Sequence, residues 1–540
     1  MEKLSNFLNS LIFHDERVIF IVFGSLGSYY IYKKMLPLFS NGRKQLWKNI
    51  PFIKKKVVNE IQKMKENNDK HDESYYNKLV EKLRASGVTK VETGNINTIQ
   101  ETGLNKETLI TYLQTLKDMD ATPKLLSGTM YDDRENQHKE IMQTAYNLYA
   151  YTNPMHIDLF HSVVFMEKNL IVMISKLLGN LEHQCGSITN GGTESIFLAL
   201  KTYRDMKCAK MSNNGLLKNV HANMHKINVV VPDTVHCSVD KLCHYLNIKL
   251  VKIKSNHQHR ITVCDILKTI NEYTACVVLS APSYGFGIMD DVEHIAPTMK
   301  ERGIPVHVDA CLGGFVWMFQ EREMASKYSF HVDGVTSISA CLHKYGYSQK
   351  GVSCILYRDE SYLKYQYFVT ADWDGGLYVS PTILGSRSGG LVAQAWTGFL
   401  SRGYKEYQDS SNKIIQLAKY AHERLQLVNE CHMFPLDLHI VCFDVGKDTY
   451  KLYDYLVTKG FHLNALQNPA AIHLCVTKTH DECIMDALVQ EIETFIQCKD
   501  TLQYKEDLAP IYGMKASIPV YTNEILNECI SSYLINKYST

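Results

Sequence analysis

The segment ACVVLSAPSYGFGIMDDVEHIAPTMKERGIPVHVDA, residues 275–310, contains the pattern that decides the fold. Two short apolar runs with many β-branched residues, ACVVLS (275–280) and IPVHVD (304–309), flank a stretch whose apolar residues recur at helical spacing, DDVEHIAPTMKERG (290–303). Continuously apolar strands that alternate with helices are typical of a parallel sheet covered on both faces. The segment therefore predicts one strand–helix–strand unit of an α/β fold.

The same alternation continues on both sides of this segment. The further strand-like runs are INVVVP (227–232), VTSISA (335–340), VSCILY (352–357), LHIVCF (438–443) and AIHLCV (471–476). The last two runs predict a smaller C-terminal α/β domain. We therefore expect an α/β protein with a mostly parallel sheet, in which ligands bind beyond the carboxyl ends of the strands.

Composition limits the classes of function. The 540 residues include 58 basic and 57 acidic side chains, which nearly cancel, so nucleic-acid binding is not expected. The fifteen cysteines include no Cys-x-x-Cys pair and no zinc-like spacing, so no metal site is expected either. This usage favours reduced, mostly buried thiols in a domain that faces the cytosol.

A candidate membrane anchor lies near the N-terminus. Residues 18–32 carry no charge, and because Lys33 and Lys34 can extend toward the interface, about 19 residues (18–36) are available to span a bilayer. Two cations precede this segment and eight follow it by residue 56, so the positive-inside rule predicts that the rest of the chain is cytosolic. A buried or interfacial helix is the alternative.

These features divide the chain into five predicted parts. They are a lumenal tail (1–17), a transmembrane anchor (18–36), a charged stalk and N-terminal arm (37–125), a large domain (126–375) and a small C-terminal domain (376–540). The large domain contains most of the predicted strands, so we expect the ligand site there.

The motif NGGTES (190–195) is typical of an anion-binding turn. It opens a stretch of helical spacing, ESIFLALKTYRDM (194–206). Two glycines permit a tight turn, and the helix N-terminus offers free N–H groups to an anion. We expect Thr193 and Ser195 to cap this helix. An ordinary loop-to-helix turn is the alternative interpretation.

Three side chains with acid–base chemistry lie at the ends of predicted strands: His236, Asp309 and Lys344. A lysine whose pKa is lowered in a partly desolvated pocket can bind an aldehyde, a carboxylate can pair with a protonated ring nitrogen, and an imidazole can stack on an aromatic ring. Each residue alone also has a structural interpretation. Together with the glycine-rich turn, however, they match the aldehyde, nitrogen, ring face and phosphate of pyridoxal 5'-phosphate (PLP).

Several longer segments resemble one known family, the sphingosine-1-phosphate lyases. The segments are SITNGGTESIFLALKTYRD (187–205), PVHVDACLGGF (305–315), VTSISACLHKYGY (335–347) and SPTILGSRSGG (380–390), with weaker similarity in SGTMY (127–131), TNPMHIDLF (152–160) and IYGMKAS (511–517). The resemblance implies a fold-type I PLP enzyme, like aspartate aminotransferase, in the group II decarboxylase branch.

The resemblance also implies roles for ten residues. For the cofactor, Lys344 matches the lysine that holds it, Asp309 the partner of its ring nitrogen, His236 the stacked residue, Gly192 and Thr193 the phosphate cradle, and His343 and Ser386 further contacts. For the substrate phosphate, the matching residues are Tyr131, His156 and Lys350. In the family the segment around Ser386 serves the neighbouring subunit's site, which implies a homodimer with shared active sites.

The activity implied by this resemblance is PLP-dependent cleavage of phosphorylated sphingoid bases into a long-chain aldehyde and phosphoethanolamine. The implied location is the endoplasmic reticulum membrane, with one span and a cytosolic catalytic domain. A PLP amino-acid decarboxylase is one alternative. A divergent PLP-binding paralogue with weak or no lyase activity is another.

Departures from the family pattern motivate the second alternative. Where the family reads S-A-D-T-H-K, this chain has Cys341 and Leu342 in place of the acid and the hydroxyl. Asp132 and Asp133 replace a Trp-Gly pair, and residues 281–290 also differ from the usual pattern. The residues matched to the cofactor remain, so the sequence predicts PLP binding more firmly than turnover.

Overall fold

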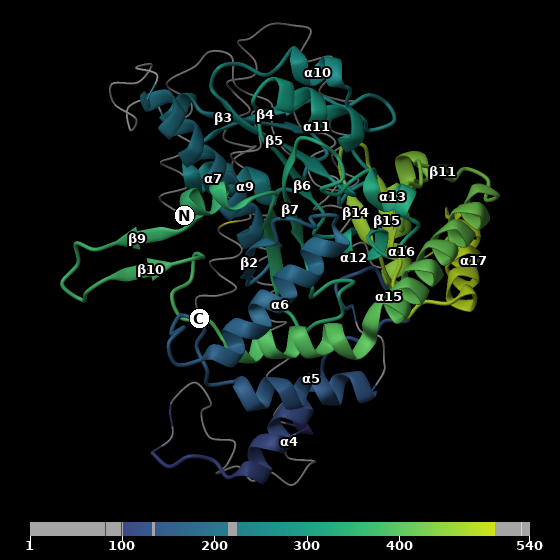
Figure 1. Cartoon of the computed structure of the whole chain (residues 1–540). Coiled ribbons are helices and arrows are strands. Elements are labelled where there is room, and N and C mark those ends of the chain that lie inside the picture. Colours follow the sequence, from purple (N-terminus) through teal and green to yellow (C-terminus); the bar gives the residue numbers. More distant parts are fainter. Residues whose placement is uncertain are drawn as a thin grey trace, which may run out of the picture.

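The computed structural model describes residues 81–82, 99, 101–131, 136–213, 224–499, 501–502 and 531. Its centre is a seven-stranded sheet with strand order β2-β8-β7-β6-β5-β3-β4 (Figure 1). The strands are β2 (Cys185–Thr189), β3 (Asn228–Pro232), β4 (Lys249–Ile253), β5 (Thr274–Ser280), β6 (Val306–Asp309), β7 (Val335–Ala340) and β8 (Ser353–Tyr357). All five strands predicted in this region are present within one or two residues of their predicted bounds.

The sheet is mostly parallel, as the sequence predicts. Only β8 runs against its neighbours, because it pairs antiparallel with both β2 and β7. The apolar pattern of β8 does not reveal this direction, since a strand buried on both faces has the same composition in either orientation. Strand β2 is an addition to the predicted set.

Helices cover both faces of this sheet. On β5, where every residue is buried, Val277 and Leu279 pack into one core cluster while Cys276 and Val278 pack into another. Helices α6 (His161–Leu177) and α11 (Val292–Glu301) contribute to the first cluster. Helices α7 (Gly192–Asn213) and α9 (Ser238–Leu246) contribute to the second. Successive residues of a strand point alternately to the two covered faces, so all of them are buried, and this explains why the strands are continuously apolar in sequence.

The C-terminal part forms a smaller antiparallel sheet of order β11-β12-β15-β14. Its strands are β11 (His432–Met433), β12 (Ile440–Asp444), β14 (Asn464–Leu466) and β15 (Ala471–Cys475), and it is accompanied by α16 (Thr449–Thr458) and α17 (Glu482–Cys498). The two strands predicted from sequence here are β12 and β15. The parallel pair of β1 (Leu125–Leu126) with β13 (Phe461–His462) joins the predicted start of the large domain to this part.

One long helix links the two sheets. Helix α15 (Gly389–Gln426) is kinked at Gly403, whose φ of 64° suits glycine. It contacts α5 (Asn136–Tyr149) and α6 on one side and α17 on the other (Figure 1). The predicted small domain, 376–540, therefore includes a helix that packs on both parts of the molecule.

The predicted anchor, residues 18–36, lies outside the described residues. Among the helices that the structure describes, none is long and apolar enough to cross a membrane.

Candidate active site

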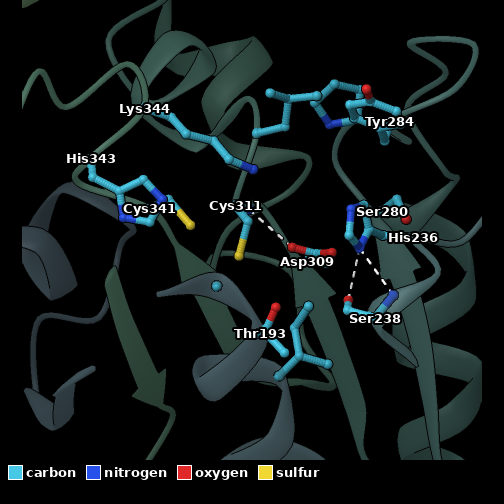
Figure 2. A pocket seen from close by; sticks show the side chains of 14 residues that line it. Thr193, His236, Ser238, Ser280, Tyr284, Asp309, Cys311, Cys341, His343 and Lys344 are labelled. Carbon is cyan, nitrogen blue, oxygen red and sulfur yellow. Dashed lines mark hydrogen bonds between the residues drawn. The ribbon is translucent and has the colours of Figure 1, made fainter. Parts of the chain in front are cut away.

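A cavity of about 600 Å³, including the open space at its mouth, lies at the carboxyl ends of β5, β6 and β7 (Figure 2). Its lining residues are Gly192, Thr193, Ile196, His236, Ser238, Ser280, Pro282, Tyr284, Asp309, Cys311, Leu312, Cys341, His343 and Lys344. Six of the seven residues that the sequence assigns to a cofactor thus share one cavity. The position agrees with the rule that ligands bind beyond the carboxyl ends of parallel strands.

Lys344 follows β7 in a turn whose backbone bonds include Tyr347 N–H to the Lys344 carbonyl at 3.0 Å. Burial lowers the pKa of the Lys344 ammonium, but Cys341, Cys311, Asp309 and Cys475 together raise it by more. This pKa therefore lies above its ordinary value. The sequence argument considered desolvation alone, and for the cofactor-free pocket its expectation of a lowered pKa is wrong.

Asp309 is the end point of a chain of hydrogen bonds that runs beneath the cavity. The Tyr203 hydroxyl donates to Ser337 Oγ at 2.6 Å, and Ser337 Oγ lies 2.7 Å from Nδ1 of the buried His307. His307 Nε2 lies 3.2 Å from Ser339 Oγ, which donates to the Asp309 carboxylate at 3.3 Å. Because the tyrosine donates at one end and a carboxylate accepts at the other, the chain stabilises a negative charge on Asp309.

His307 is neutral within this chain. Burial lowers the pKa of the His307 imidazole to about 4, although Asp309 opposes the shift. With Nδ1 accepting from Ser337, the ring proton lies on Nε2 and faces Ser339. From the sequence, His307 was predicted only as a residue of a strand. Its role in the hydrogen-bond chain depends on the register between β6 and β7, which places it beside Ser337 and Ser339.

His236 is fixed in the cavity wall by its own turn. The Ser238 N–H donates to His236 Nδ1 at 3.1 Å, and the Ser238 hydroxyl lies 2.8 Å from the same nitrogen (Figure 2). Since Nδ1 accepts, the ring proton is on Nε2. Burial lowers the pKa of His236, so the side chain presents a neutral, oriented ring to the cavity. Its ring also contacts Tyr284 edge-on, with centroids 5.7 Å apart.

The glycine-rich turn requires both of its glycines. Gly191 has φ 152°, which other residues rarely adopt. At Gly192 a Cβ atom would lie 2.8 Å from the sulfur of Cys311 and 2.8 Å from the sulfur of Cys341. The start of α7 therefore packs directly on these two thiols. Thr193, the next residue, lines the cavity.

The capping role predicted for Thr193 and Ser195 is wrong. Helix α7 begins at Gly192, so both residues lie inside its first turn. The Ser195 hydroxyl instead lies 2.7 Å from Thr189 Oγ1 and 3.0 Å from Ser353 Oγ, where it joins the helix to β2 and β8. These bonds leave the first backbone N–H groups of α7 available to an anion.

Tyr131 and Lys350 form a pair at the same end of the sheet. The Lys350 ammonium lies 4.8 Å from the centre of the Tyr131 ring, and Nζ donates to the His343 carbonyl at 3.5 Å. Burial, followed by the charge of Lys344, lowers the pKa of Lys350. Burial also raises the pKa of Tyr131 well above its ordinary value, so the phenol keeps its proton.

His156 and Ser386 lie elsewhere on the chain, joined through Asn153. The Asn153 amide donates to Ser386 Oγ at 3.1 Å and accepts from the Arg387 N–H at 3.2 Å. Both His156 and Ser386 are exposed, and neither lines the cavity. Within one chain the three predicted phosphate ligands are therefore not assembled: Tyr131 and Lys350 are in contact, and His156 is not with them.

Several site residues were not predicted. Ser280 ends β5 beside Asp309 and lines the cavity, and its buried hydroxyl has no hydrogen-bond partner among the described residues. Tyr284 also lines the cavity, on the same side as His236 (Figure 2). Glu194 accepts from the N–H groups of Asn190 at 2.6 Å and Ile383 at 3.0 Å, and so ties the glycine-rich turn to the SPTILGSR segment. The strand-end rule that selected Asp309 would also have selected Ser280.

Comparison with known proteins identifies the family. Residues 146–445 match the family described as the pyridoxal-dependent decarboxylase conserved domain. A sphingosine-1-phosphate lyase of Arabidopsis thaliana is 36% identical over 76% of this chain and 76% of its own length. One from Drosophila melanogaster is 34% identical over 93% of this chain and 90% of its own. The chain belongs to the sphingosine-1-phosphate lyase family.

A solved structure agrees with this assignment. The sphingosine-1-phosphate lyase of Burkholderia pseudomallei has a TM-score of 0.69 with 27% identity, over 75% of this chain and 94% of its own. The fold is therefore that of the fold-type I PLP enzymes, and the protein is a PLP-dependent lyase.

The residues of the cavity fit this cofactor. Its phosphate matches the start of α7, where no side chain fits at Gly192 and the unpaired Ser280 hydroxyl lies within the same cavity. Its aldehyde matches Lys344, and its ring nitrogen matches the Asp309 carboxylate, which is supported from below by Ser339. His236 presents a neutral ring to the space between them.

Proposed function

We propose that this protein cleaves phosphorylated sphingoid bases, such as sphingosine 1-phosphate, into a long-chain aldehyde and phosphoethanolamine. The observation that carries the proposal is the position of Lys350 over Tyr131, next to His343 at the cavity. A cation and a protonated phenol together suit a phosphate monoester. The named relatives support the same substrate class.

The reaction breaks the bond between C2 and C3 of the base, while the C3 hydroxyl loses a proton and C2 gains one. When bound, PLP supplies an aldehyde that captures amines and a ring that accepts the electron pair left on C2. The ionised Asp309 favours a positive charge on the ring nitrogen. Lys344 exchanges with the substrate amine and can return a proton.

Three groups are candidates for the base that removes the C3 hydroxyl proton: Lys344, a tyrosine and the substrate phosphate. Two tyrosines near Lys344, Tyr131 and Tyr345, have pKa values raised well above the ordinary one by burial, so they stay protonated and do not serve as the base. Tyr284 lines the cavity itself.

The test is a steady-state assay of purified, PLP-loaded protein with sphingosine 1-phosphate, sphingosine and a panel of amino acids. We expect aldehyde release from the phosphorylated base. Carbon dioxide release from an amino acid would instead support the decarboxylase that the family description permits. Bound PLP without turnover of any of these would support the divergent paralogue suggested by Cys341 and Leu342.

We also propose that the protein is a homodimer with shared active sites. Two regions expose large apolar side chains. One is the hairpin of β9 (Phe368–Thr370) and β10 (Tyr378–Ser380), which extends from the body in Figure 1, with the residues just after it. The other is residues 148–165. The exposed side chains are Leu148, Tyr151, Ile157, Leu159, Phe165, Phe368, Val369, Trp373, Leu377, Val379, Ile383 and Leu384. The Asn153–Ser386 bond joins the two regions, and apolar surface of this extent favours association.

A membrane location is the last part of the proposal. Residues 18–36 would cross the endoplasmic reticulum membrane once, and the eight cations between residues 33 and 56 would keep residues 40–540 cytosolic. Protease added to sealed microsomes should digest residues 40–540 and spare a tag at the N-terminus. Glycosylation at an acceptor engineered near residue 60 would reverse the proposed orientation.

A further inference from the structure

Two cysteines, Cys311 and Cys341, lie just after the ends of the paired strands β6 and β7. Asp309 is the register partner of Ser339, and the Ala310 N–H still donates to the Ser339 carbonyl at 2.9 Å. Cys311 and Cys341 each lie two residues after this pair. The two cysteines therefore lie close to each other just past the ends of neighbouring strands.

Contacts confirm that the two thiols meet. A Cβ atom at Gly192 would lie 2.8 Å from each sulfur, so both sulfurs border one small space under α7. The Cys311 sulfur also lies 3.3 Å from Ser339 Oγ. Neighbouring strands lie about 4.8 Å apart, which is within the Cα separation of roughly 4.4–6.8 Å that a disulfide requires.

The two thiols also differ in acidity. A hydrogen bond with Cys311 lowers the pKa of the Cys341 thiol, and the Lys344 ammonium acts in the same direction against burial. The same hydrogen bond raises the pKa of Cys311. One thiol of the pair therefore ionises more readily, and its partner keeps a proton. This arrangement suits a nucleophilic and a resolving cysteine.

Among the described residues, the pair is exposed to the cavity and otherwise buried. Both side chains are buried, yet both line the cavity beside Lys344 (Figure 2). Other buried cysteines among the described residues, such as Cys276 and Cys354, do not line it. A small oxidant that enters the cavity thus meets these two thiols first.

We propose that Cys311 and Cys341 are a modification site at which hydrogen peroxide converts two thiols into a reversible disulfide. The Cys341 thiolate attacks a peroxide oxygen, so a sulfur–oxygen bond forms, the oxygen–oxygen bond breaks and water leaves with one proton. The Cys311 sulfur then attacks the oxidised sulfur, so the disulfide forms and the sulfur–oxygen bond breaks. The Cys311 proton leaves in a second water, and the peroxide has gained the two electrons lost by the thiols.

The disulfide weakens cofactor binding. The two sulfurs support Gly192, and the Cys311 N–H donates to the Asp309 carboxylate at 3.0 Å. Moving the sulfurs to a bond length of about 2.05 Å shifts both neighbours. The same reaction removes the two cysteine groups that raise the pKa of Lys344, while Asp309 remains. Reduction by a dithiol restores both thiols and the original packing.

The test treats the purified, PLP-loaded protein with hydrogen peroxide, blocks free thiols by alkylation and maps disulfides by peptide mass spectrometry. We expect a crosslink between the peptides that contain Cys311 and Cys341, and dithiothreitol should reverse it. Cofactor retained after desalting, read by absorbance, should fall in proportion to the crosslinked fraction. Neither readout depends on which substrate the site accepts.

Two variants make the result specific. Cys341→Ser should lose the crosslink and retain its cofactor in peroxide. Cys354→Ser, a buried cysteine on β8 whose neighbour is Ala340, should form the crosslink as the parent protein does. Oxidation confined to exposed thiols such as Cys237, with Cys311 and Cys341 still alkylated, would overturn the proposal. A crosslink that leaves cofactor occupancy unchanged would overturn the link to cofactor binding.

Discussion

Ser339 donates its hydroxyl proton to the Asp309 carboxylate at 3.3 Å, directly below the cavity that holds Lys344. This bond is the last in a chain of donors that begins at Tyr203 and passes through the neutral His307. The buried carboxylate therefore has polar support on the side away from the cavity. Its negative charge is available to a positive ring nitrogen on the other side.

The first prediction concerns this charge. Asp309→Asn should still bind PLP, because the amide has the size of the carboxylate and can accept from the Cys311 N–H. Turnover should fall at least about a hundredfold, since a neutral partner no longer stabilises a protonated ring. Cofactor absorbance and kcat measured on the same sample separate the two effects.

A matched control is Asp333→Asn, which removes an exposed carboxylate paired with Lys300. It should leave kcat unchanged. Ser339→Ala should give a smaller loss than Asp309→Asn, because it removes one donor of about 1–3 kcal/mol and keeps the charge. Near-normal turnover in Asp309→Asn would contradict the assigned role.

The second prediction concerns the substrate phosphate. Lys350→Ala should lower kcat/KM for the phosphorylated base about ten- to a hundredfold, since one charge-assisted hydrogen bond is worth roughly 1.5–3 kcal/mol. It should leave PLP occupancy intact and reduce the preference over the unphosphorylated base. Competition between the two bases in one assay measures that preference directly.

The chain offers a close control for Lys350. Lys364 lies 4.9 Å from the centre of the Tyr365 ring in the same cation–aromatic geometry. Neither lysine lines the cavity, but Lys350 is hydrogen-bonded to the carbonyl of His343, which does. Lys364→Ala should change neither the rate nor the preference. Equal activity of the unmutated protein on both bases would refute the phosphate site itself.

The catalytic positions could be predicted because their signal is local. Asp309 and Lys344 stand where an apolar run ends, and the glycine-rich turn opens a helical pattern. The contact of Cys311 with Cys341 was not predictable, since it depends on the register between β6 and β7, which the sequence does not state. The pKa of Lys344 was missed for a related reason: Cys341 precedes it on the same segment, but Cys311, Asp309 and Cys475, which also raise this pKa, come from other strands and turns.

The third prediction concerns stability and pH. Burial raises the pKa of Asp290 to about 7. The Ser280 N–H, which donates to the Asp290 carboxylate at 2.7 Å, lowers this pKa but by less. Between the unfolded pKa near 3.9 and this value, the folded state binds more protons than the unfolded state. The contribution of Asp290 to stability is therefore fully present below about pH 4 and falls by up to about 1.4 kcal/mol per pH unit until about pH 7.

Asp290→Asn removes this titration while its carbonyl can still accept from Ser280. The variant's melting temperature relative to the parent should therefore be higher at pH 8 than at pH 5. Asp333→Asn again serves as the control: Lys300 lowers the pKa of Asp333, so that residue is ionised at both pH values. A relative melting temperature of Asp290→Asn that does not change with pH would show that Asp290 does not carry this shift.

The last prediction tests the shared active sites. Ser386 and His156 are exposed and do not line the cavity that contains Lys344, so we expect them to serve the site of a second subunit. Lys344→Ala inactivates the site that its own chain builds. Ser386→Tyr, placed on an exposed segment, should fold and inactivate only the site of its partner. Each variant alone should therefore be inactive.

Mixing the two variants distinguishes the arrangements. If Ser386 serves the partner's site, a mixed dimer has one site with both residues intact. Random pairing makes half of the dimers mixed, so the co-expressed variants should recover about one quarter of the parent activity. If Ser386 serves its own chain's site, every site in the mixture lacks one residue and no activity returns. Differently tagged chains, purified in sequence, isolate the mixed dimer, which should then show about half of the parent's activity per dimer.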